Sequence, residues 1–140
     1  MTPTFLELAE VVEIHRDQIE RYGGAQGIRD LGLLQSALAM PSAGAGDEYF
    51  HDDMVSMAAA YLFHLVKNHP FVDGNKRVGA VAAVVFLDLN SVELVAPEDD
   101  FEALVMGVAA GRTTKAQVSQ FFRDHSSPAR PRGRGRKGDR

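Results

Sequence analysis

Nine positions in the middle of the chain hold an unusual set of polar side chains. The stretch HPFVDGNKR, residues 69–77, lies between two apolar runs. A histidine titrates near neutral pH and can take a proton from a hydroxyl group. An aspartate supplies the hard oxygen ligand that Mg²⁺ prefers, and a short basic segment after a glycine can hold an anion. These residue types at this spacing indicate the transfer of a phosphate-bearing group.

The anion site is predicted at the start of a helix that begins near Asn75. The first backbone N–H groups of a helix have no partner within it, and the helix dipole favours negative charge there. Gly74 permits a tight turn and the close approach of a ligand. Lys76 and Arg77 add positive charge, and Asn75 adds an amide that could bridge loop and ligand. No glycine stands five residues before Gly74, so the loop is not of the Walker type.

The remaining residues of the stretch have separate predicted roles. Asp73 is the predicted magnesium ligand, with phosphate oxygens and water completing the coordination. His69 is the predicted base for an incoming hydroxyl. Phe71 and Val72 are expected to anchor the loop on the core and so fix the geometry of transfer.

Structural interpretations compete with these functional ones. A histidine before a proline usually ends a helix, and basic residues at a helix start are usually solvated. The other four histidines offer weaker sites. His64 is expected in the core and His51 in a loop, whereas His15 and His125 have no obvious partner. His64 and His69 are five residues apart, which does not suit a zinc pair on one helix face.

Apolar spacing and capping signals around the motif predict an all-α fold of about six helices and no sheet. The helix-bearing stretches are FLELAEVVEIHRDQIERYGG, LGLLQSALAMP, MVSMAAAYLFHLVKN, NKRVGAVAAVVFLDLN, PEDDFEALVMGVAAG and KAQVSQFFRDH. The predicted caps are Thr4 with Glu7, Asp30, Asp52 or Asp53, and Thr114 with Gln117. The third and fourth stretches are apolar nearly all round, so two buried helices should flank the motif.

Length and composition bound the class of protein. A chain of 140 residues without cysteine can form one domain with a sizeable core and no disulfides. No stretch is long and apolar enough for a membrane span and no signal-peptide pattern begins the chain, so we expect a cytoplasmic protein.

Charge divides the chain into an acidic body and a basic tail. Residues 1–125, the predicted catalytic domain, carry 9 Lys and Arg against 18 Asp and Glu. Residues 126–140 carry 6 Lys and Arg against one Asp, and their composition predicts a disordered basic tail. The acidic body argues against broad nucleic-acid binding by the domain. The tail is interpreted first as a solubilising extension and second as an arm that contacts RNA weakly.

The motif HPFVDGNKR resembles the signature of the Fic fold in the form found in Doc toxins, and the resemblance extends over residues 1 to about 125. It implies a helical bundle with the motif loop between two central helices, preceded by a flap within 42–51. It also implies His69 as catalytic base, Phe71 as loop anchor and Asp73 as the metal ligand. The implied phosphate-binding residues are Gly74, Asn75, Lys76 and Arg77.

The resemblance further implies a reaction and partners. Doc toxins transfer the γ-phosphoryl of ATP, with Mg²⁺, to a threonine of elongation factor Tu and so block translation. No glutamate here is followed by glycine or asparagine, as the self-inhibitory Fic motif requires. The resemblance therefore implies a Phd-like antitoxin acting in trans.

Two alternatives remain open at the level of sequence. Fic proteins of another kind transfer AMP and carry a second glycine and a final arginine where this chain has Lys76 and Ala80. Both departures favour a serine/threonine kinase over an AMP transferase. A non-catalytic helical module that binds a partner or RNA is the second alternative, and it leaves His69 and Asp73 unexplained.

Overall fold

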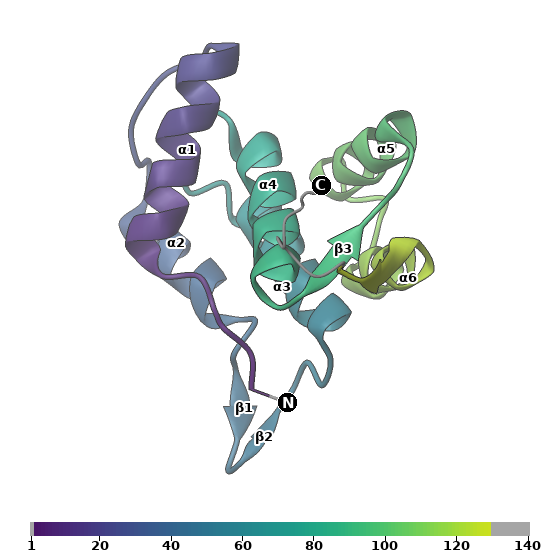
Figure 1. Cartoon of the computed structure of the whole chain (residues 1–140). Helices are drawn as coiled ribbons and strands as arrows, with labels where there is room; N and C mark the ends of the chain where they lie inside the picture. Colours follow the sequence, from purple (N-terminus) through teal and green to yellow (C-terminus); the bar gives the residue numbers. More distant parts are fainter. Residues whose placement is uncertain (1, 130–140) are drawn as a thin grey trace, which may run out of the picture.

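The computed structural model describes residues 2–129 as a bundle of helices with two short pairs of strands (Figure 1). The helices are α1 (Leu8–Tyr22), α2 (Leu31–Ala39), α3 (Met54–Asn68), α4 (Asn75–Leu89), α5 (Glu98–Ala109) and α6 (Lys115–His125). Helices α3 and α4 lie at the centre, with α1 and α2 on one side and α5 and α6 on the other. The prediction of an all-α fold with the motif loop between two central helices is confirmed.

The contact between α3 and α4 forms the middle of the core. Tyr61, Leu62 and Leu65 of α3 and Phe86 of α4 are fully buried. The helices approach closely at Gly79, where a Cβ atom would lie 2.8 Å from Val66 Cγ2. Because an added methyl group there would meet packed atoms, glycine at this position sets how closely the two helices flanking the motif can lie.

The helix starts largely follow the predicted capping signals. The carboxylates of Asp30 and Asp53 accept hydrogen bonds from backbone N–H groups at the starts of α2 and α3. Thr114 and Gln117 form the predicted capping box of α6. The prediction for α1 is wrong by three residues, because Glu7 caps the helix and pairs with Glu10 instead of Thr4 with Glu7.

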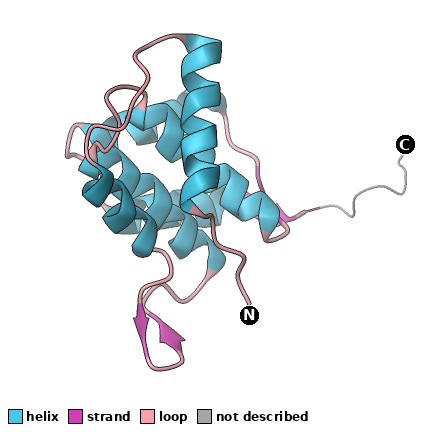
Figure 2. Ribbon diagram, turned by 90° about the vertical axis from the view of Figure 1, so that its left-hand side faces the viewer, coloured by secondary structure: helices cyan, strands magenta, loops and turns pink. Residues whose placement is uncertain are grey.

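Two antiparallel strand pairs were not predicted. β1 (Gly44–Ala45) and β2 (Glu48–Tyr49) form a hairpin that projects from the bundle, within the segment where the flap was expected (Figure 2). β3 (Val92–Leu94) pairs with β4 (Ser126–Pro128). The predicted domain boundary at residue 125 is the last residue of α6, and the described chain continues into β4. Residues 130–140 of the predicted tail lie outside the described residues.

A cluster of three basic side chains joins α3, α6 and the loop after the hairpin. The Nζ of Lys115 lies 3.1 Å from Nε2 of His64, which is half-buried. His51 contributes a second imidazole, whose Nδ1 is buried and has no hydrogen-bond partner within residues 2–129. Burial, and then the charge of Lys115, lowers the pKa of His64 to about 4. The same two causes lower the pKa of His51.

This cluster predicts a loss of stability in mild acid. An unfolded chain binds a proton at His64 near pH 6.5, whereas the folded chain excludes it until about pH 4. The contribution of His64 to the free energy of unfolding should therefore be constant above pH 6.5 and be lost between pH 6.5 and 4. We expect this contribution to be about 1 to 2 kcal/mol, because solvent screens a half-exposed group.

Thermal unfolding between pH 7.5 and 4 measures the effect. His64→Gln keeps an acceptor for Lys115 but does not titrate, so its melting temperature should fall less over this range. A wild-type protein and a variant with parallel curves would show that His64 does not cause the pH dependence.

Candidate active site

One pocket of about 280 Å³ opens where the carboxyl end of α3, the motif loop and the amino end of α4 meet. Its lining residues come from these three segments and from the end of α5. They are Val66, Lys67, His69, Asp73, Gly74, Asn75, Lys76, Arg77 and Ala109. The structure therefore brings together every polar residue of the predicted site around a single cavity.

His69 ends α3 in a left-handed backbone conformation, with φ 52° and ψ 53°. Such a conformation is uncommon for a residue other than glycine and needs support from its surroundings. Arg29 gives that support, because its Nε donates to the His69 carbonyl at 2.8 Å and its Nη2 donates to the Asn68 carbonyl at 3.1 Å. The imidazole itself is exposed and makes no hydrogen bond to another residue of 2–129, so it is free to act on a substrate.

The segment before α2 holds the rest of the motif loop from outside. The backbone N–H groups of Arg29 and Asp30 both donate to the Pro70 carbonyl, at 2.7 and 3.0 Å. Val72 donates to the Gly27 carbonyl at 3.0 Å. These bonds run from residues 27–30 to residues 70–72 and so fix the path of the loop between its two helices.

The Asp73 carboxylate lies at the rim of the pocket. Its Oδ2 accepts a hydrogen bond from the Ala25 N–H at 3.3 Å, and its Oδ1 accepts one from the Gly74 N–H at 2.9 Å. These two backbone donors, Ala25 first, lower the pKa of Asp73 below its usual value. Gly24 allows this arrangement, since a Cβ atom there would lie 2.7 Å from Oδ2 and its φ is +117°.

The first turn of α4 supplies the anion donors. Gly74 precedes it with φ 80°, and its N–H is already bonded to Asp73. The N–H groups of the next three residues, Asn75, Lys76 and Arg77, have no acceptor among residues 2–129. The dipole of this helix of 15 residues adds positive potential at the same place.

The side chain of Asn75 bonds to the backbone of the motif loop. It is 4% exposed, its Oδ1 accepts from the Phe71 N–H at 2.9 Å, and its Nδ2 donates to the Phe71 carbonyl at 3.0 Å. Phe71 is fully buried, whereas Val72 is 48% exposed, so the prediction that Val72 anchors the loop is wrong. Asn75 therefore shapes the loop through its side chain and offers the pocket its backbone N–H.

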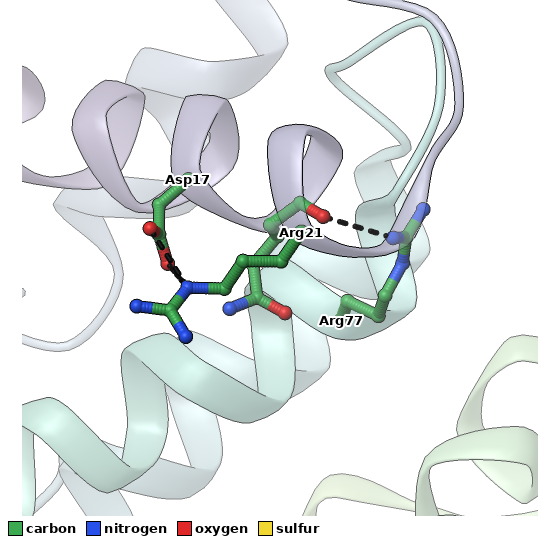
Figure 3. Close-up of polar contacts among 4 residues, drawn as sticks. Asp17, Arg21 and Arg77 are labelled. Atoms are coloured by element: carbon green, nitrogen blue, oxygen red, sulfur yellow. Dashed lines mark hydrogen bonds and ion pairs between the residues drawn. The ribbon is translucent and has the colours of Figure 1, made fainter.

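The two basic residues of the motif differ in their surroundings. The guanidinium of Arg77 donates to the carbonyls of Gln18 and Gly23 at the end of α1, at 3.1 and 2.9 Å. Figure 3 shows the first of these two bonds. The charge of Arg77 thus lies at the edge of the pocket while its side chain ties α4 to α1. Lys76 is exposed and has no hydrogen-bond or ion-pair partner among the described residues.

A second, more open pocket of about 550 Å³ adjoins the first and shares Lys76 and Arg77 with it. Apolar side chains, among them Phe101, Val105 and Met106, form much of its lining, and Glu98, Asp99 and Glu102 line it as well. Ala80, the position of the final arginine in the AMP-transferase pattern, lines this second pocket and not the first. A long side chain at position 80 would therefore occupy space that alanine leaves open.

The site fits a magnesium ion held mainly by phosphate. No group of three or more His, Cys, Asp or Glu side chains within residues 2–129 could form an all-protein metal cage. Asp73 is ionised, exposed and placed beside the free amides of α4. One carboxylate together with phosphate oxygens and water is the usual way in which Mg²⁺ is bound at phosphate-transfer sites.

Three residues near the site were not assigned to it by the sequence analysis. His15 is 3% exposed and contacts the motif loop, and Arg29 holds the end of α3. Lys67 lines the first pocket beside the motif. Only Lys67 carried a signal, because it stands two residues before His69. The partners of His15 and Arg29 are distant in sequence.

Comparisons with known proteins agree with this geometry. A model of the Fic/DOC family matches residues 5–87. The protein named Toxin Doc from Mycolicibacterium smegmatis is 42% identical over 78 residues, which cover 56% of this chain and 60% of that protein. The Protein kinase doc of Escherichia phage P1 is 30% identical over 114 residues, 81% of this chain and 89% of that protein.

An all-helical bundle with this motif loop is the architecture that the resemblance implied, and the chain belongs to the Fic/DOC family. Within that family its relatives include the Doc toxins just described. The match spans less than two thirds of the mycobacterial relative and most of the phage protein. No helix within the described part of the chain has the length and hydropathy needed to cross a membrane.

Proposed function

We propose that this chain is a toxin-type serine/threonine protein kinase, which transfers the γ-phosphoryl group of ATP to a hydroxyl of a target protein in the presence of Mg²⁺. One observation carries the proposal: an exposed imidazole, an ionised carboxylate and three helix amides line the same pocket, and within residues 2–129 neither the imidazole nor the amides have a hydrogen-bond partner. The names of the two relatives, a toxin and a protein kinase, support the same reaction.

In the proposed step, the hydroxyl oxygen of the target forms a bond to the γ-phosphorus of ATP. The bond between that phosphorus and the oxygen bridging the β and γ positions breaks, and ADP leaves. His69 accepts the proton of the hydroxyl and later releases it to water. The products are a phosphorylated protein and ADP.

The residues at the start of α4 stabilise the charge on the phosphoryl oxygens. The N–H groups of Asn75, Lys76 and Arg77 would donate to an anion at the helix end, and the Lys76 ammonium has no partner among residues 2–129. Asp73 would hold Mg²⁺, which when bound neutralises phosphate charge. Because Arg29 and Gly27 fix the loop backbone, these groups are oriented before the substrate arrives.

The space around Ala80 favours attack at the γ position. The first pocket, at about 280 Å³, has room for phosphates rather than for a whole nucleotide. The second pocket shares Lys76 with the first, and its apolar side chains together with Glu98, Asp99 and Glu102 suit an uncharged nucleoside better than phosphates. Placing the nucleoside there leaves the terminal phosphoryl group beside His69.

The target and the regulator follow the resemblance to Doc toxins. The proposed target is a threonine of elongation factor Tu in the cytoplasm, and the proposed regulator is a Phd-like antitoxin acting in trans. The expected RNA contact of the basic tail concerns residues outside those described.

Mass mapping of modified peptides tests the proposal. Purified protein is incubated with ATP, Mg²⁺ and a matched cell lysate, and His69→Ala serves as the control. We expect phosphate on one or a few hydroxyl side chains with the wild type and none with the variant. Peptides that carry AMP, or no modified peptide at all, would contradict the kinase proposal.

A further inference from the structure

Helix α1 contacts the motif loop through a histidine that the reaction does not use directly. His15 Nε2 lies 2.9 Å from the backbone carbonyl oxygen of Asp73. Its ring stacks on the ring of Phe71, with centroids 4.0 Å apart and planes inclined by 6°. His15 is 3% exposed, so both contacts are made inside the protein. A carbonyl oxygen can only accept a hydrogen bond, and Nε2 must therefore carry the proton.

We infer that His15 is a positioning residue of the transfer site, which sets the placement of the Asp73 carboxylate and of the first turn of α4. The inference rests on the proposed function for its kinetic part. Its structural part concerns the position of residues 73–77 and stands on the contacts of His15 alone.

The geometry of a peptide group explains how His15 acts at a distance from the pocket. The Asp73 carbonyl and the Gly74 N–H belong to one planar unit and point in opposite directions. A hydrogen bond that holds the carbonyl therefore also directs the Gly74 N–H, which donates to the Asp73 carboxylate at 2.9 Å. The same peptide group leads into the amides that face the anion site. Rotation of this unit would displace both the carboxylate and the helix start.

Other residues of α1 also contact the start of α4 and help to hold it in place. Arg77 binds the carbonyls of Gln18 and Gly23, and the Ile19 side chain lies within 3.1 Å of the position a Cβ atom of Gly74 would take. His15 contributes the contact to Asp73 itself. A purely structural histidine would need only to fill its space, whereas a positioning residue must donate to this particular carbonyl.

Two substitutions distinguish the effect of the His15 ring from the effect of its hydrogen-bond donor. His15→Phe keeps an aromatic ring against Phe71 but removes the donor and leaves the part-buried Asp73 carbonyl without this partner. His15→Gln removes the ring but offers an amide N–H at about the reach of Nε2. If His15→Phe does not fold, His15→Met gives a flexible apolar side chain of similar length without a donor.

The experiment compares backbone amide NMR signals, ATP affinity and steady-state kinetics at a temperature at which all variants are folded. In His15→Phe we expect displaced signals for residues 74–77 and about a tenfold smaller gain in ATP affinity on adding Mg²⁺. We also expect kcat to fall by about 10- to 100-fold, because small misplacements at a reacting centre have effects of this size. His15→Gln should recover most of each effect.

Two results would overturn the inference. One is unchanged signals of residues 74–77 in His15→Phe with normal Mg²⁺-dependent ATP binding. The other is equal loss in His15→Phe and His15→Gln that follows only their melting temperatures, which would make His15 a core residue. If the wild type transfers no phosphoryl group, the proposed function fails, but the NMR comparison still decides whether His15 positions residues 74–77.

Discussion

His69→Ala is expected to lower the rate of phosphoryl transfer by about 10²- to 10⁴-fold, the range that a positioned general base contributes. The side chain is exposed in the pocket and makes no hydrogen bond to another described residue. Its removal should therefore leave the melting temperature nearly unchanged. ATP affinity should also be retained, because the imidazole acts on the incoming hydroxyl and not on the phosphates.

The matched control is His125→Ala at the end of α6, because the His125 imidazole bonds to the Phe121 carbonyl in the same helix and does not line the pocket. That variant should transfer phosphate at close to the wild-type rate. Growth inhibition by His69→Ala at wild-type strength would show that another group takes the proton.

Asp73→Asn is expected to remove the effect of Mg²⁺ on ATP binding and to lower transfer by about 10²- to 10³-fold, as the loss of one charge-stabilising group does elsewhere. The amide keeps the shape of the carboxylate but can accept from only one of the Ala25 and Gly74 N–H groups, so the melting temperature of the variant is measured together with its activity. Because the Ala25 and Gly74 amides lower the pKa of Asp73, the wild-type carboxylate is charged throughout the neutral range.

Calorimetric titration of ATP with and without Mg²⁺ measures this change directly. Asp47→Asn, in the turn of the projecting hairpin, removes an equal charge away from the pocket and serves as the control. If the ATP affinity of Asp73→Asn still rises with Mg²⁺ as it does in the wild type, Asp73 does not bind the metal.

Local sequence signals predicted most of the helices, because they depend on neighbouring residues. Asp30, Asp53 and Thr114 each act within one helical turn, and the structure has them as caps. The continuous apolar character of α3 and α4 likewise identified the buried pair that flanks the motif. The strand pairs were not predicted because the strands are only two or three residues long, and because β3 pairs with a strand more than thirty residues away.

The support of the site could not be predicted, because it depends on contacts distant in sequence. His15 and Asp73 are 58 residues apart, and Arg29 and His69 are 40 apart. Helical spacing indicates which face of α1 is buried, but not which carbonyl that face meets. For the same reason the sequence showed the charge of Arg77 and not its bonds to the end of α1.

The position of the label transferred from ATP tests the central claim most directly. Purified protein and its target are incubated with ATP labelled at either the α or the γ phosphorus, with Mg²⁺ present. Since the kinase reaction breaks the bond to the β–γ bridging oxygen, only γ label should appear on the target, with ADP in solution. Label from the α position on the target, with release of pyrophosphate, would show that the chain transfers AMP despite Lys76 and Ala80.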